Sequence, residues 1–467
     1  MASTKLICTI GPASSGKKAI RALARAGMTA ARINTAFGNP AEWKAILEAV
    51  RESCGVPVIF DLKGPDTRMM AETERDIKKG EIVSVGFAKG HGGGFYFNRD
   101  ISGQISAGDV LVVNGGLVKF KAVGKSKGEA QLRALNPGFL KNAGSVHSLS
   151  REFDLPAISE QDMKVIALAK KEGEKVFALS MARSSKDVLE LRRLAGESTI
   201  ISKIESRTGV ANADGLIESS DAIMIARGDL GIELPMQKVP LVQKSIIRKC
   251  LAAGKASIVA TQMLESMMGS PVPARADVSD IANAIMDGAD CLMLSGETAT
   301  GKYPALAAAT MAKIADEIER SSMQRQAAGL IPDGSGNYSE IICNCVREMA
   351  TSTGVTKIIT PTRSGFTPRM VSRFRIGKPI YALTESAAVA KSLQFYAGVT
   401  PVLVKKEPKT PEECVGEAAA HGLIAKNDVL AVTLGQFSNK PATNTIYYID
   451  IGNSEFRGIA SKTPKGR

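Results

Sequence analysis

The chain has 467 residues, of which 44% are hydrophobic, 23% charged and only 5% aromatic. This length allows two or three domains, because a domain commonly holds about 100–200 residues. The formal net charge is +13, but lysine and arginine are spread along the chain, and aromatic residues for stacking bases are scarce. We therefore expect a basic surface that suits small anionic substrates, and no nucleic-acid partner.

The seven cysteines indicate an intracellular protein without a zinc site. No two of them form a CxxC pair, and only His91, His147 and His421 could join a thiolate site. Reduced, buried thiols are then the default, so we expect a cytoplasmic location. No signal peptide is recognisable, and no apolar run approaches the ~18 residues of a membrane span, so we expect no membrane association.

Short apolar runs alternate with helical stretches along most of the chain, which predicts a parallel sheet with crossover helices. Eight such runs precede residue 300, and eight is the number of strands that a closed (β/α)₈ barrel requires. The expected barrel strands are residues 5–10, 29–34, 56–62, 176–181, 199–204, 222–226, 256–261 and 290–295.

Two further regions have a different texture. Residues 69–154 separate the third and fourth strands and combine glycine-rich turns with short β-like runs, which predicts an inserted β-rich lid over the C-terminal face of the barrel. Strand-like runs resume after a polar linker at 321–338. We expect a barrel from 1–68 and 155–329, a lid from 69–154, and a three-layer α/β domain from 330–467 with strands at 357–361, 379–383, 400–405, 428–433 and 445–451.

Charged or hydroxyl side chains stand at seven of the eight expected strand ends, where active sites of such barrels lie. Residues two apart on a strand point to the same side, so three pairs should converge on the barrel mouth. Each pair could be a plain ion pair, but buried ion pairs are costly, and their convergence favours a functional site. The residues concerned are Arg32 with Asn34, Asp61 with Lys63, Ser180, Lys203 with Glu205, Asp229, Thr261 and Ser295.

This set of side chains fits phosphoryl transfer, which requires positioning and neutralisation of charge on the moving group. Glu205 and Asp229 are hard oxygen donors suited to Mg²⁺. Lys203 can meet phosphoryl oxygens as a point charge, while Arg32 and Arg68 can hold phosphates bidentately. The turn 226–231 can offer free backbone N–H groups to a carboxylate if a helix begins there. An ordinary strand-to-helix loop is the alternative for that turn.

Long motifs in this chain resemble the pyruvate kinase family. The resemblance runs in order along the whole chain and is weakest in 69–154 and in the C-terminal third. The segments that carry it are CTIGPAS (8–14), ARIN (31–34), DLKGPDTR (61–68), LPAISEQD (155–162), IISKIESRTGVANADGLIESSDAIMIARGDLGIELP (200–235) and, within 256–304, VATQMLESM, PVPARADVSDIANAIMDGAD and MLSGETATGKYP.

The resemblance implies Mg²⁺- or Mn²⁺-dependent transfer of a phosphoryl group from phosphoenolpyruvate to ADP, giving pyruvate and ATP, in a homotetramer. It implies that Lys203 stabilises the transferring group and that Glu205 and Asp229 hold the metal. The other implied site residues are Arg32, Arg68, Lys63 and Ser180 for phosphate or nucleotide, Thr261 with Gly228 and Asp229 for the substrate, Ser295 for enolate protonation, and Asn34 and Asp61 for a monovalent cation.

The chain departs from the family pattern at several positions. Ala36 replaces a serine that coordinates the monovalent cation, and Phe37 replaces a histidine that touches the nucleotide, so we expect weak activation by K⁺. In the lid, Asn114-Gly115-Gly116 replaces an Asp-Asp-Gly motif. The loop with Thr362, Ser364, Gly365 and Thr367 resembles an effector-binding loop for a sugar phosphate, but a simple helix N-cap explains it equally well.

Two other functions remain open at this stage. One is another enzyme of phosphoenolpyruvate or 2-oxoacids on the same barrel, such as an aldolase or lyase, which would not need the Lys203 position or the lid. The other is a non-catalytic or altered-specificity paralogue that only binds metabolites, which would be expected to lose the set Lys203, Glu205 and Asp229. Here this set is complete.

Overall fold

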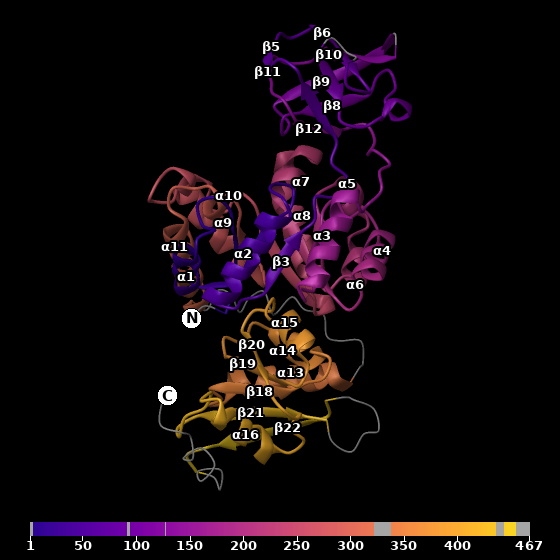
Figure 1. Cartoon of the computed structure of the whole chain (residues 1–467). Coiled ribbons are helices and arrows are strands. Elements are labelled where there is room, and N and C mark those ends of the chain that lie inside the picture. The colour runs from indigo at the N-terminus through magenta and orange to yellow at the C-terminus, as the bar shows by residue number, and fades with distance from the viewer. Residues whose placement is uncertain (1–2, 91–93, 127, 322–337, 436–442, 454–467) are drawn as a thin grey trace.

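The computed structural model describes residues 3–90, 94–126, 128–321, 338–435 and 443–453. Three parts are arranged along one axis: a small β barrel at the top, a larger α/β barrel in the middle, and a sheet with flanking helices below (Figure 1). The predicted fold class, a (β/α)₈ barrel with an inserted β-rich lid and a C-terminal α/β domain, is confirmed.

The central barrel closes through eight parallel strands, one for each expected run. Its strands are nearly continuous apolar runs, because both faces of such a strand are buried. In order around the barrel they are β1 (Lys5–Thr9), β17 (Cys291–Leu294), β16 (Ala256–Ala260), β15 (Ala222–Ala226), β14 (Thr199–Ile204), β13 (Val176–Leu179), β3 (Val58–Asp61) and β2 (Met28–Asn34).

Helices surround the barrel, and side chains cap the N-termini of some of them. Asn39 accepts hydrogen bonds from the backbone of Ala41 and Glu42, and Ser159 and Asp162 form a reciprocal capping box, so both helices begin where these side chains satisfy free N–H groups. The helices are α1 (Lys17–Arg25), α2 (Pro40–Ser53), α3 (Glu160–Lys171), α4 (Ser185–Ala195), α5 (Arg207–Ala211), α6 (Ala213–Ser219), α7 (Arg227–Glu233), α8 (Val239–Ala253), α9 (Arg275–Met286), α10 (Gly296–Ala299) and α11 (Pro304–Arg320).

The lid is a second closed barrel, made of short strands. In its longest strand, β9, Val118, Phe120 and Ala122 are buried while Lys119 and Lys121 are exposed, the alternation expected when one face packs on a core. Its strands are β4 (Arg68–Ala71), β6 (Ile82–Gly86), β7 (Phe95–Phe97), β8 (Val110–Val113), β9 (Val118–Ser126), β10 (Glu129–Ala134) and β12 (Gly144–Ser148), with β5 (Arg75–Ile77) paired to β11 (Gly138–Leu140) beside them.

The C-terminal part is a five-stranded sheet in the order β20-β19-β18-β21-β22, of which only β22 runs antiparallel to its neighbour. The expected linker 321–338 lies outside the described residues except at its two ends. The elements are α13 (Tyr338–Ser352), β18 (Lys357–Pro361), α14 (Phe366–Ser372), β19 (Ile380–Thr384), α15 (Ala387–Leu393), β20 (Val399–Leu403), α16 (Pro411–Ala420), β21 (Val429–Leu434) and β22 (Thr445–Asp450).

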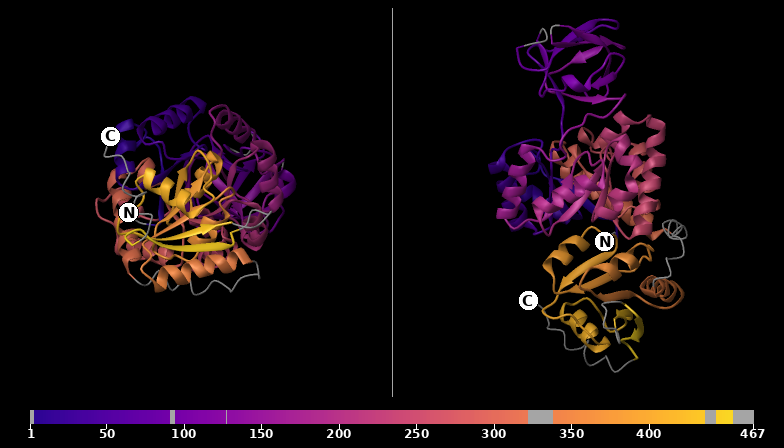
Figure 2. Two further views of the ribbon diagram at one scale, coloured as in Figure 1. Left: turned by 90° about the horizontal axis from the view of Figure 1, so that it is seen from below. Right: turned by 90° about the vertical axis from the view of Figure 1, so that its right-hand side faces the viewer.

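The C-terminal part covers the lower end of the barrel, as the view from below shows (Figure 2). Side chains inside the barrel, such as Ile7 and Met224, belong to one continuous apolar core with Val371 and Phe395 of the C-terminal part. This end is therefore closed by apolar packing. Only the upper end, where the strands finish beneath the lid, is available for a site.

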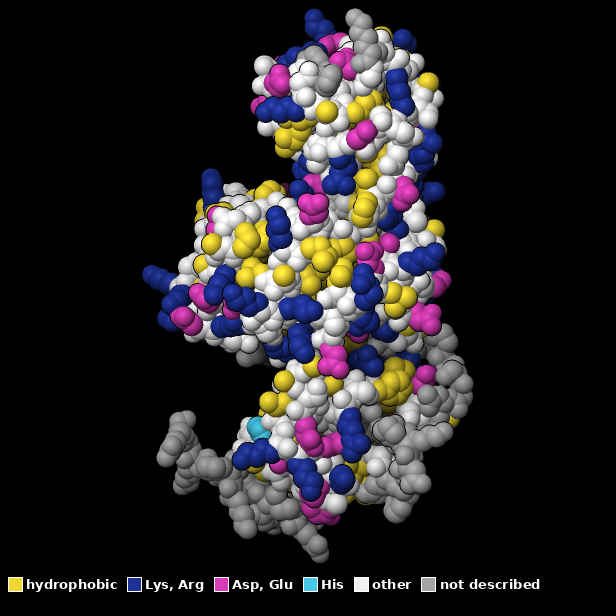
Figure 3. All heavy atoms as spheres, turned by 45° about the vertical axis from the view of Figure 1, so that its right-hand side comes forward, with side chains coloured by type: hydrophobic (Ala, Val, Ile, Leu, Met, Phe, Trp, Pro, Cys, Tyr) yellow, Lys and Arg dark blue, Asp and Glu magenta, His cyan; other side chains and the backbone are white. Residues whose placement is uncertain are grey.

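The surface and the thiols agree with the composition. On the face shown in Figure 3, basic side chains are interspersed with acidic ones over all three parts and form no single stripe. All seven cysteines are free; five are buried as expected, but Cys54 is half-buried and Cys345 is exposed. Among the described residues, no helix is both long enough and apolar enough to cross a membrane.

Candidate active site

A cavity of about 250 Å³ lies between the upper end of the barrel and the lid. Its wall combines side chains from the ends of β2, β13 and β14 with lid residues such as His147. It also brings together most of the site residues expected from the sequence: Arg32, Asn34, Lys63, Arg68, Ser180, Lys203, Glu205 and Asp229.

Lys203 is the centre of the polar contacts below this cavity. Its Nζ donates to Ser180 Oγ at 2.8 Å and lies 3.0 Å from Glu205 Oε1 and 3.2 Å from Asp61 Oδ1. Burial lowers the pKa of this ammonium, but the charges of Asp61 and Glu205 outweigh burial and raise the pKa above its usual value. Lys203 is therefore a fixed positive charge, held by neighbours at the ends of the three strands β13, β14 and β3.

Asp61 joins two cations. Its Oδ2 lies 2.6 Å from Arg32 Nε, while Oδ1 faces Lys203, and Arg32 Nη1 donates to Thr9 Oγ1 at 3.0 Å. Burial raises the pKa of Asp61, but the charges of Lys203 and Arg32 outweigh it and hold the pKa low. The carboxylate thus orients both cations towards the cavity.

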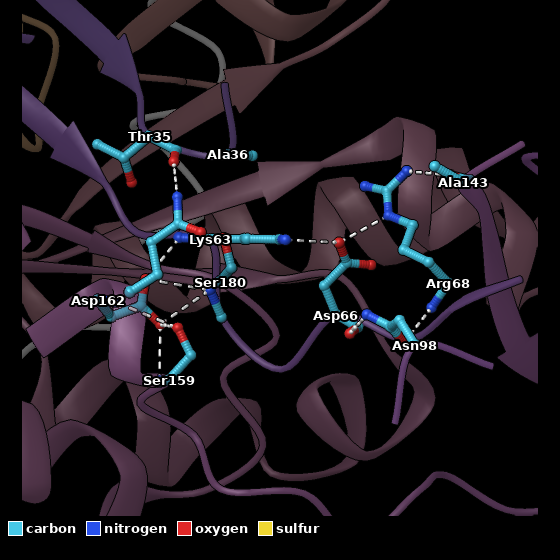
Figure 4. Close-up of polar contacts among 12 residues, drawn as sticks. Thr35, Ala36, Lys63, Asp66, Arg68, Asn98, Ala143, Ser159, Asp162 and Ser180 are labelled. Carbon is cyan, nitrogen blue, oxygen red and sulfur yellow. Dashed lines mark hydrogen bonds and ion pairs between the residues drawn. The ribbon is translucent and has the colours of Figure 1, made fainter. Parts of the chain in front are cut away.

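The expected pairing of Asp61 with Lys63 is wrong. Strand β3 ends at Asp61, so Lys63 lies in the following turn, and its Nζ points away to Asp66 Oδ2 at 3.6 Å (Figure 4). Asp66 Oδ2 also accepts from Arg68 Nε at 2.7 Å, and Arg68 Nη1 donates to the carbonyl of Ala143 in the lid at 3.0 Å. Lys63 and Arg68 therefore form a half-exposed rim where the barrel meets the lid.

The turn that carries Lys63 is fixed by a buried carboxylate. Asp162, at the N-terminus of α3, accepts the backbone N–H groups of Lys63 at 2.8 Å and Gly64 at 3.2 Å, and also bonds to Ser159 (Figure 4). Gly64 has φ +70, and a Cβ there would lie 2.9 Å from Ser180 Cβ, so only glycine fits this position. The turn therefore holds Lys63 at the cavity without support from a strand.

Glu205 and Asp229 offer carboxylate oxygens to one side of the cavity. Glu205 Oε2 accepts from the backbone N–H of Met181 at 2.7 Å, and Asp229 stands in the first turn of α7. Burial raises the pKa of Glu205, and the charge of Asp229 raises it further, although Lys203 acts in the opposite direction. A divalent cation between the two carboxylates would relieve this repulsion.

These two carboxylates fit Mg²⁺. Among the described residues, no group of three or more His, Cys, Asp or Glu side chains could hold a metal by itself. Mg²⁺ does not require one, because it commonly binds one or two carboxylates and completes its shell with waters and substrate oxygens. Glu205 and Asp229, both on the cavity wall, match that pattern.

Thr261 and Gln262 form an unusual turn after β16. Their φ values are +67 and +53, a conformation that non-glycine residues rarely adopt. Arg227 stabilises the turn by donating to the carbonyls of Thr261 and Gln262 at 2.8 and 2.9 Å. Such strain is concentrated at functional sites, which agrees with a role for Thr261.

A helix begins at Arg227, as the anion-site interpretation required, but the N–H of Gly228 is not free. It donates to Thr261 Oγ1 at 2.8 Å, because the left-handed turn brings this hydroxyl over the start of α7. Ser295, by contrast, is half-buried, and its buried Oγ has no hydrogen-bond partner among the described residues. Neither Thr261, Gly228 nor Ser295 lines the cavity itself.

Three residues that contribute to this region were missed from the sequence. His147 of lid strand β12 lies 3.3 Å from Glu233 at the end of α7, and Glu233 also lies 3.3 Å from Arg207 of α5. The only available signal was the alternation in β12, where Val146 faces the lid core and His147 faces the other side. It could place His147 on the outside of the lid, but not opposite Glu233.

The loop before α14 has contacts typical of a helix cap. Thr362 Oγ1 accepts from the N–H of Gly365 at 2.9 Å, Ser364 Oγ accepts from Phe366 at 3.4 Å, and Thr367 Oγ1 bonds to Thr443 at 2.5 Å. These contacts account for the hydroxyl groups without a ligand. An effector role for Thr362, Ser364, Gly365 and Thr367 stays a prediction.

The fold and the site together define a class of protein: a phosphotransferase on a (β/α)₈ barrel, with fixed cations and with carboxylates that could hold a metal ion under a lid. The comparisons with known proteins agree with this class. The family model described as "Pyruvate kinase, barrel domain" matches residues 1–308, and the one described as "Pyruvate kinase, alpha/beta domain" matches residues 340–447. The chain belongs to the pyruvate kinase family.

Curated relatives match over nearly the whole chain. "Pyruvate kinase" of Bacillus licheniformis is 36% identical and covers 100% of this chain and 84% of its own length. "Pyruvate kinase" of Clostridium acetobutylicum is 36% identical over 97% of this chain and 100% of its own length. That of Sporosarcina psychrophila is 35% identical, with 97% and 80% covered.

Proposed function

We propose that this chain transfers the phosphoryl group of phosphoenolpyruvate to ADP, which gives pyruvate and ATP. The observation that carries this proposal is the arrangement around Lys203, a buried ammonium within 3.2 Å of two carboxylates and beside Arg32 at the open end of the barrel. Phosphoryl transfer depends on such preorganised positive charge, because negative charge must be stabilised while the group moves.

Each side chain has a distinct task in this proposal. Lys203 and Arg32 neutralise charge on the transferring group, and Lys63 and Arg68 bind nucleotide or substrate phosphate at the rim. Glu205 and Asp229 hold Mg²⁺ or Mn²⁺, which supplies further charge neutralisation when bound. Ser180 fixes Lys203 through the 2.8 Å hydrogen bond.

The remaining steps concern the substrate carbon atoms. Loss of the phosphoryl group leaves the enolate of pyruvate, which must take up a proton at its methylene carbon. Thr261, with the adjoining Gly228 and Asp229, would hold the substrate near its methylene and carboxylate ends. Ser295, whose buried hydroxyl has no hydrogen-bond partner among the described residues, would belong to the relay that delivers the proton.

Several finer features of the protein are part of the same proposal. We expect a homotetramer, a cytoplasmic location, and the three domains 1–68 with 155–329, 69–154, and 330–467. A monovalent cation near Asn34 and Asp61 would contribute little. The alternatives of an aldolase or lyase and of a non-catalytic paralogue gain no support from the comparisons.

A coupled assay tests the proposal. The purified chain is incubated with phosphoenolpyruvate, ADP and Mg²⁺, with and without K⁺, and pyruvate is measured. Formation of pyruvate and ATP in equal amounts supports the proposal. Absence of turnover with every nucleoside diphosphate, in a chain that still binds phosphoenolpyruvate, would favour the non-catalytic paralogue instead.

A further inference from the structure

Helix α7 is shared between the proposed metal site and the lid. Its first turn carries Asp229, and the N–H of Gly228 is bonded to Thr261 Oγ1 at 2.8 Å. Its last residue, Glu233, is only 5% exposed, and Glu233 also lines the cavity. The helix is seven residues long, and Asp229 and Glu233 are four residues apart, so they lie on the same face of the helix.

Glu233 reaches the lid directly through one carboxylate oxygen and, through the other, by way of Arg207 on α5. Oε1 lies 3.3 Å from Nδ1 of His147 in lid strand β12, and Oε2 lies 3.3 Å from Nε of Arg207. Arg207 in turn donates to the carbonyls of Leu149 and Ser148 at 2.6 and 3.0 Å. These two carbonyls belong to the end of β12 and the segment that leads from the lid back to the barrel.

A lid turn also lies close to the same end of α7. A Cβ added to Gly116 would lie 3.8 Å from Cγ1 of Ile232, the neighbour of Glu233. Gly116 has φ +90, which L side chains rarely adopt. The lid thus approaches consecutive residues of α7 from strand β12 and from the turn at Gly116.

The charges explain why this contact should hold the lid. A buried carboxylate is costly unless it is paired, and removal of one partner leaves an uncompensated charge. Glu233 is compensated by Arg207 and by His147, but His147 reaches it only while the lid is in its present position. Moving the lid away would therefore leave Glu233 with Arg207 alone.

We propose that Glu233 is a positioning residue that latches the lid to α7, so that the lid and Asp229 take up their positions together. This inference rests on the proposed function for its kinetic consequences, but not for the latch itself. A substrate that stabilises the closed lid would then also stabilise Asp229 in its metal-binding position. In return, a bound metal would stabilise the closed lid.

Hydrogen exchange of the full chain without substrates tests the latch directly. Glu233→Gln keeps the shape of the side chain but removes its charge. We expect the backbone amides of 144–155 to exchange about 10-fold faster in this variant, because hydrogen bonds to a charged group are lost. His147→Asn should give a similar change, and the double variant should add little to either single one.

The matched control is Asp214→Asn, which removes a carboxylate from an exposed ion pair with Lys249 on the barrel surface. It should leave exchange in 144–155 unchanged. An unchanged rate in Glu233→Gln, or an equal change in the control, would overturn the latch.

The dependence of activity on Mg²⁺ concentration is a second measurement, and it would not change if Glu233 had only a structural role. In Glu233→Gln we expect the Mg²⁺ concentration for half-maximal activity to rise about 10-fold, with kcat reduced less, and Glu233→Asp to restore part of the loss. A fall in kcat alone, with unchanged Mg²⁺ dependence, contradicts the coupling. If the unmodified chain has no kinase activity, the proposed function fails, while the exchange experiment still decides the latch.

Discussion

The two ends of the central barrel both bury charge, but they do so in different ways. At the lower end, Asp290 pairs with Arg375 of the C-terminal part at 2.9 Å, and both side chains are almost completely buried. Asp290 Oδ1 also accepts the N–H of Ala397, and Oδ2 accepts that of Ser257, both at 3.0 Å. Every oxygen of this carboxylate thus has a protein partner.

At the upper end, the balance of charge is incomplete. Around Lys203, the three carboxylates of Asp61, Glu205 and Asp229 outnumber the two cations Lys203 and Arg32, and burial together with the charge of Asp229 raises the pKa of Glu205. The comparison teaches that a buried ion pair alone does not mark a functional site. A surplus of carboxylate beside a cavity does, because it leaves a place for a cation that comes with the substrate.

The largest expected effect is at Lys203. Lys203→Met should lower kcat by at least ~10²–10³-fold with little change in KM, because the ammonium acts mainly on charge that develops in the transition state. The measurement is steady-state kinetics with phosphoenolpyruvate and ADP, together with the melting temperature. A change confined to KM would count against this role.

At the lower end of the barrel, a substitution should reduce stability strongly and activity little. Arg375→Met leaves Asp290 buried without its cation, which costs about 3–5 kcal/mol and should lower the melting temperature by on the order of 10 °C. We expect kcat at a permissive temperature to stay near that of the unmodified chain. Thermal unfolding followed by fluorescence, with Lys249→Met in an exposed pair as control, distinguishes the two ends. Equal losses of activity in Lys203→Met and Arg375→Met would remove the contrast.

At the upper end of the barrel, the sequence alone predicted those features that depend on residues close together in the chain. Apolar runs located the strands, and the two-residue spacing between Lys203 on β14 and Glu205 just past its end placed both side chains together. The sequence did not predict contacts between residues of different domains, because these contacts depend on how the domains pack together. Nothing in the sequence links Asp290 to Arg375 or His147 to Glu233, because each pair is 85 or 86 residues apart and forms only when the domains or the lid are in place.

Local backbone geometry was the second feature that the sequence did not predict. The N–H of Gly228 is occupied because Thr261 adopts φ +67, and a threonine gives no hint of a left-handed turn. In the same way, Lys63 lies outside the strand in which it was predicted, because β3 ends two residues earlier, at Asp61. Register and turn geometry, rather than residue type, decided these positions.

A smaller effect concerns pH at the lid. Burial lowers the pKa of His147, but the hydrogen bond and charge of Glu233, with the charges of Asp229 and Asp66, outweigh burial and raise it. Arg207 is the neighbouring cation on Glu233. A raised pKa favours the protonated form in the folded chain, so the stabilisation is complete below the unfolded pKa of about 6.5 and is lost as the pH rises through the folded value.

NMR titration can measure this pKa, because the chain has only three histidines. Assignment by His147→Asn should identify one imidazole that titrates above 6.5, and Glu233→Gln should lower that pKa. We also expect exchange in 144–155, corrected for the intrinsic pH dependence, to increase from pH 6 to pH 8. An imidazole of His147 that titrates below 6.5 in the unmodified chain would contradict the pairing.

The smallest expected effect is the change in activity when K⁺ is added. The contacts at the upper end of the barrel explain why this change should be small. Ala36 offers no hydroxyl, and its own N–H donates to Asn34 Oδ1 at 3.2 Å. Asp61 already has Arg32 at one oxygen and Lys203 at the other. Replacing Na⁺ by K⁺ at constant ionic strength should therefore change kcat/KM little, whereas Ala36→Ser should increase the response by restoring an oxygen ligand. Strong activation of the unmodified chain by K⁺ would show that other groups of the cavity bind the ion.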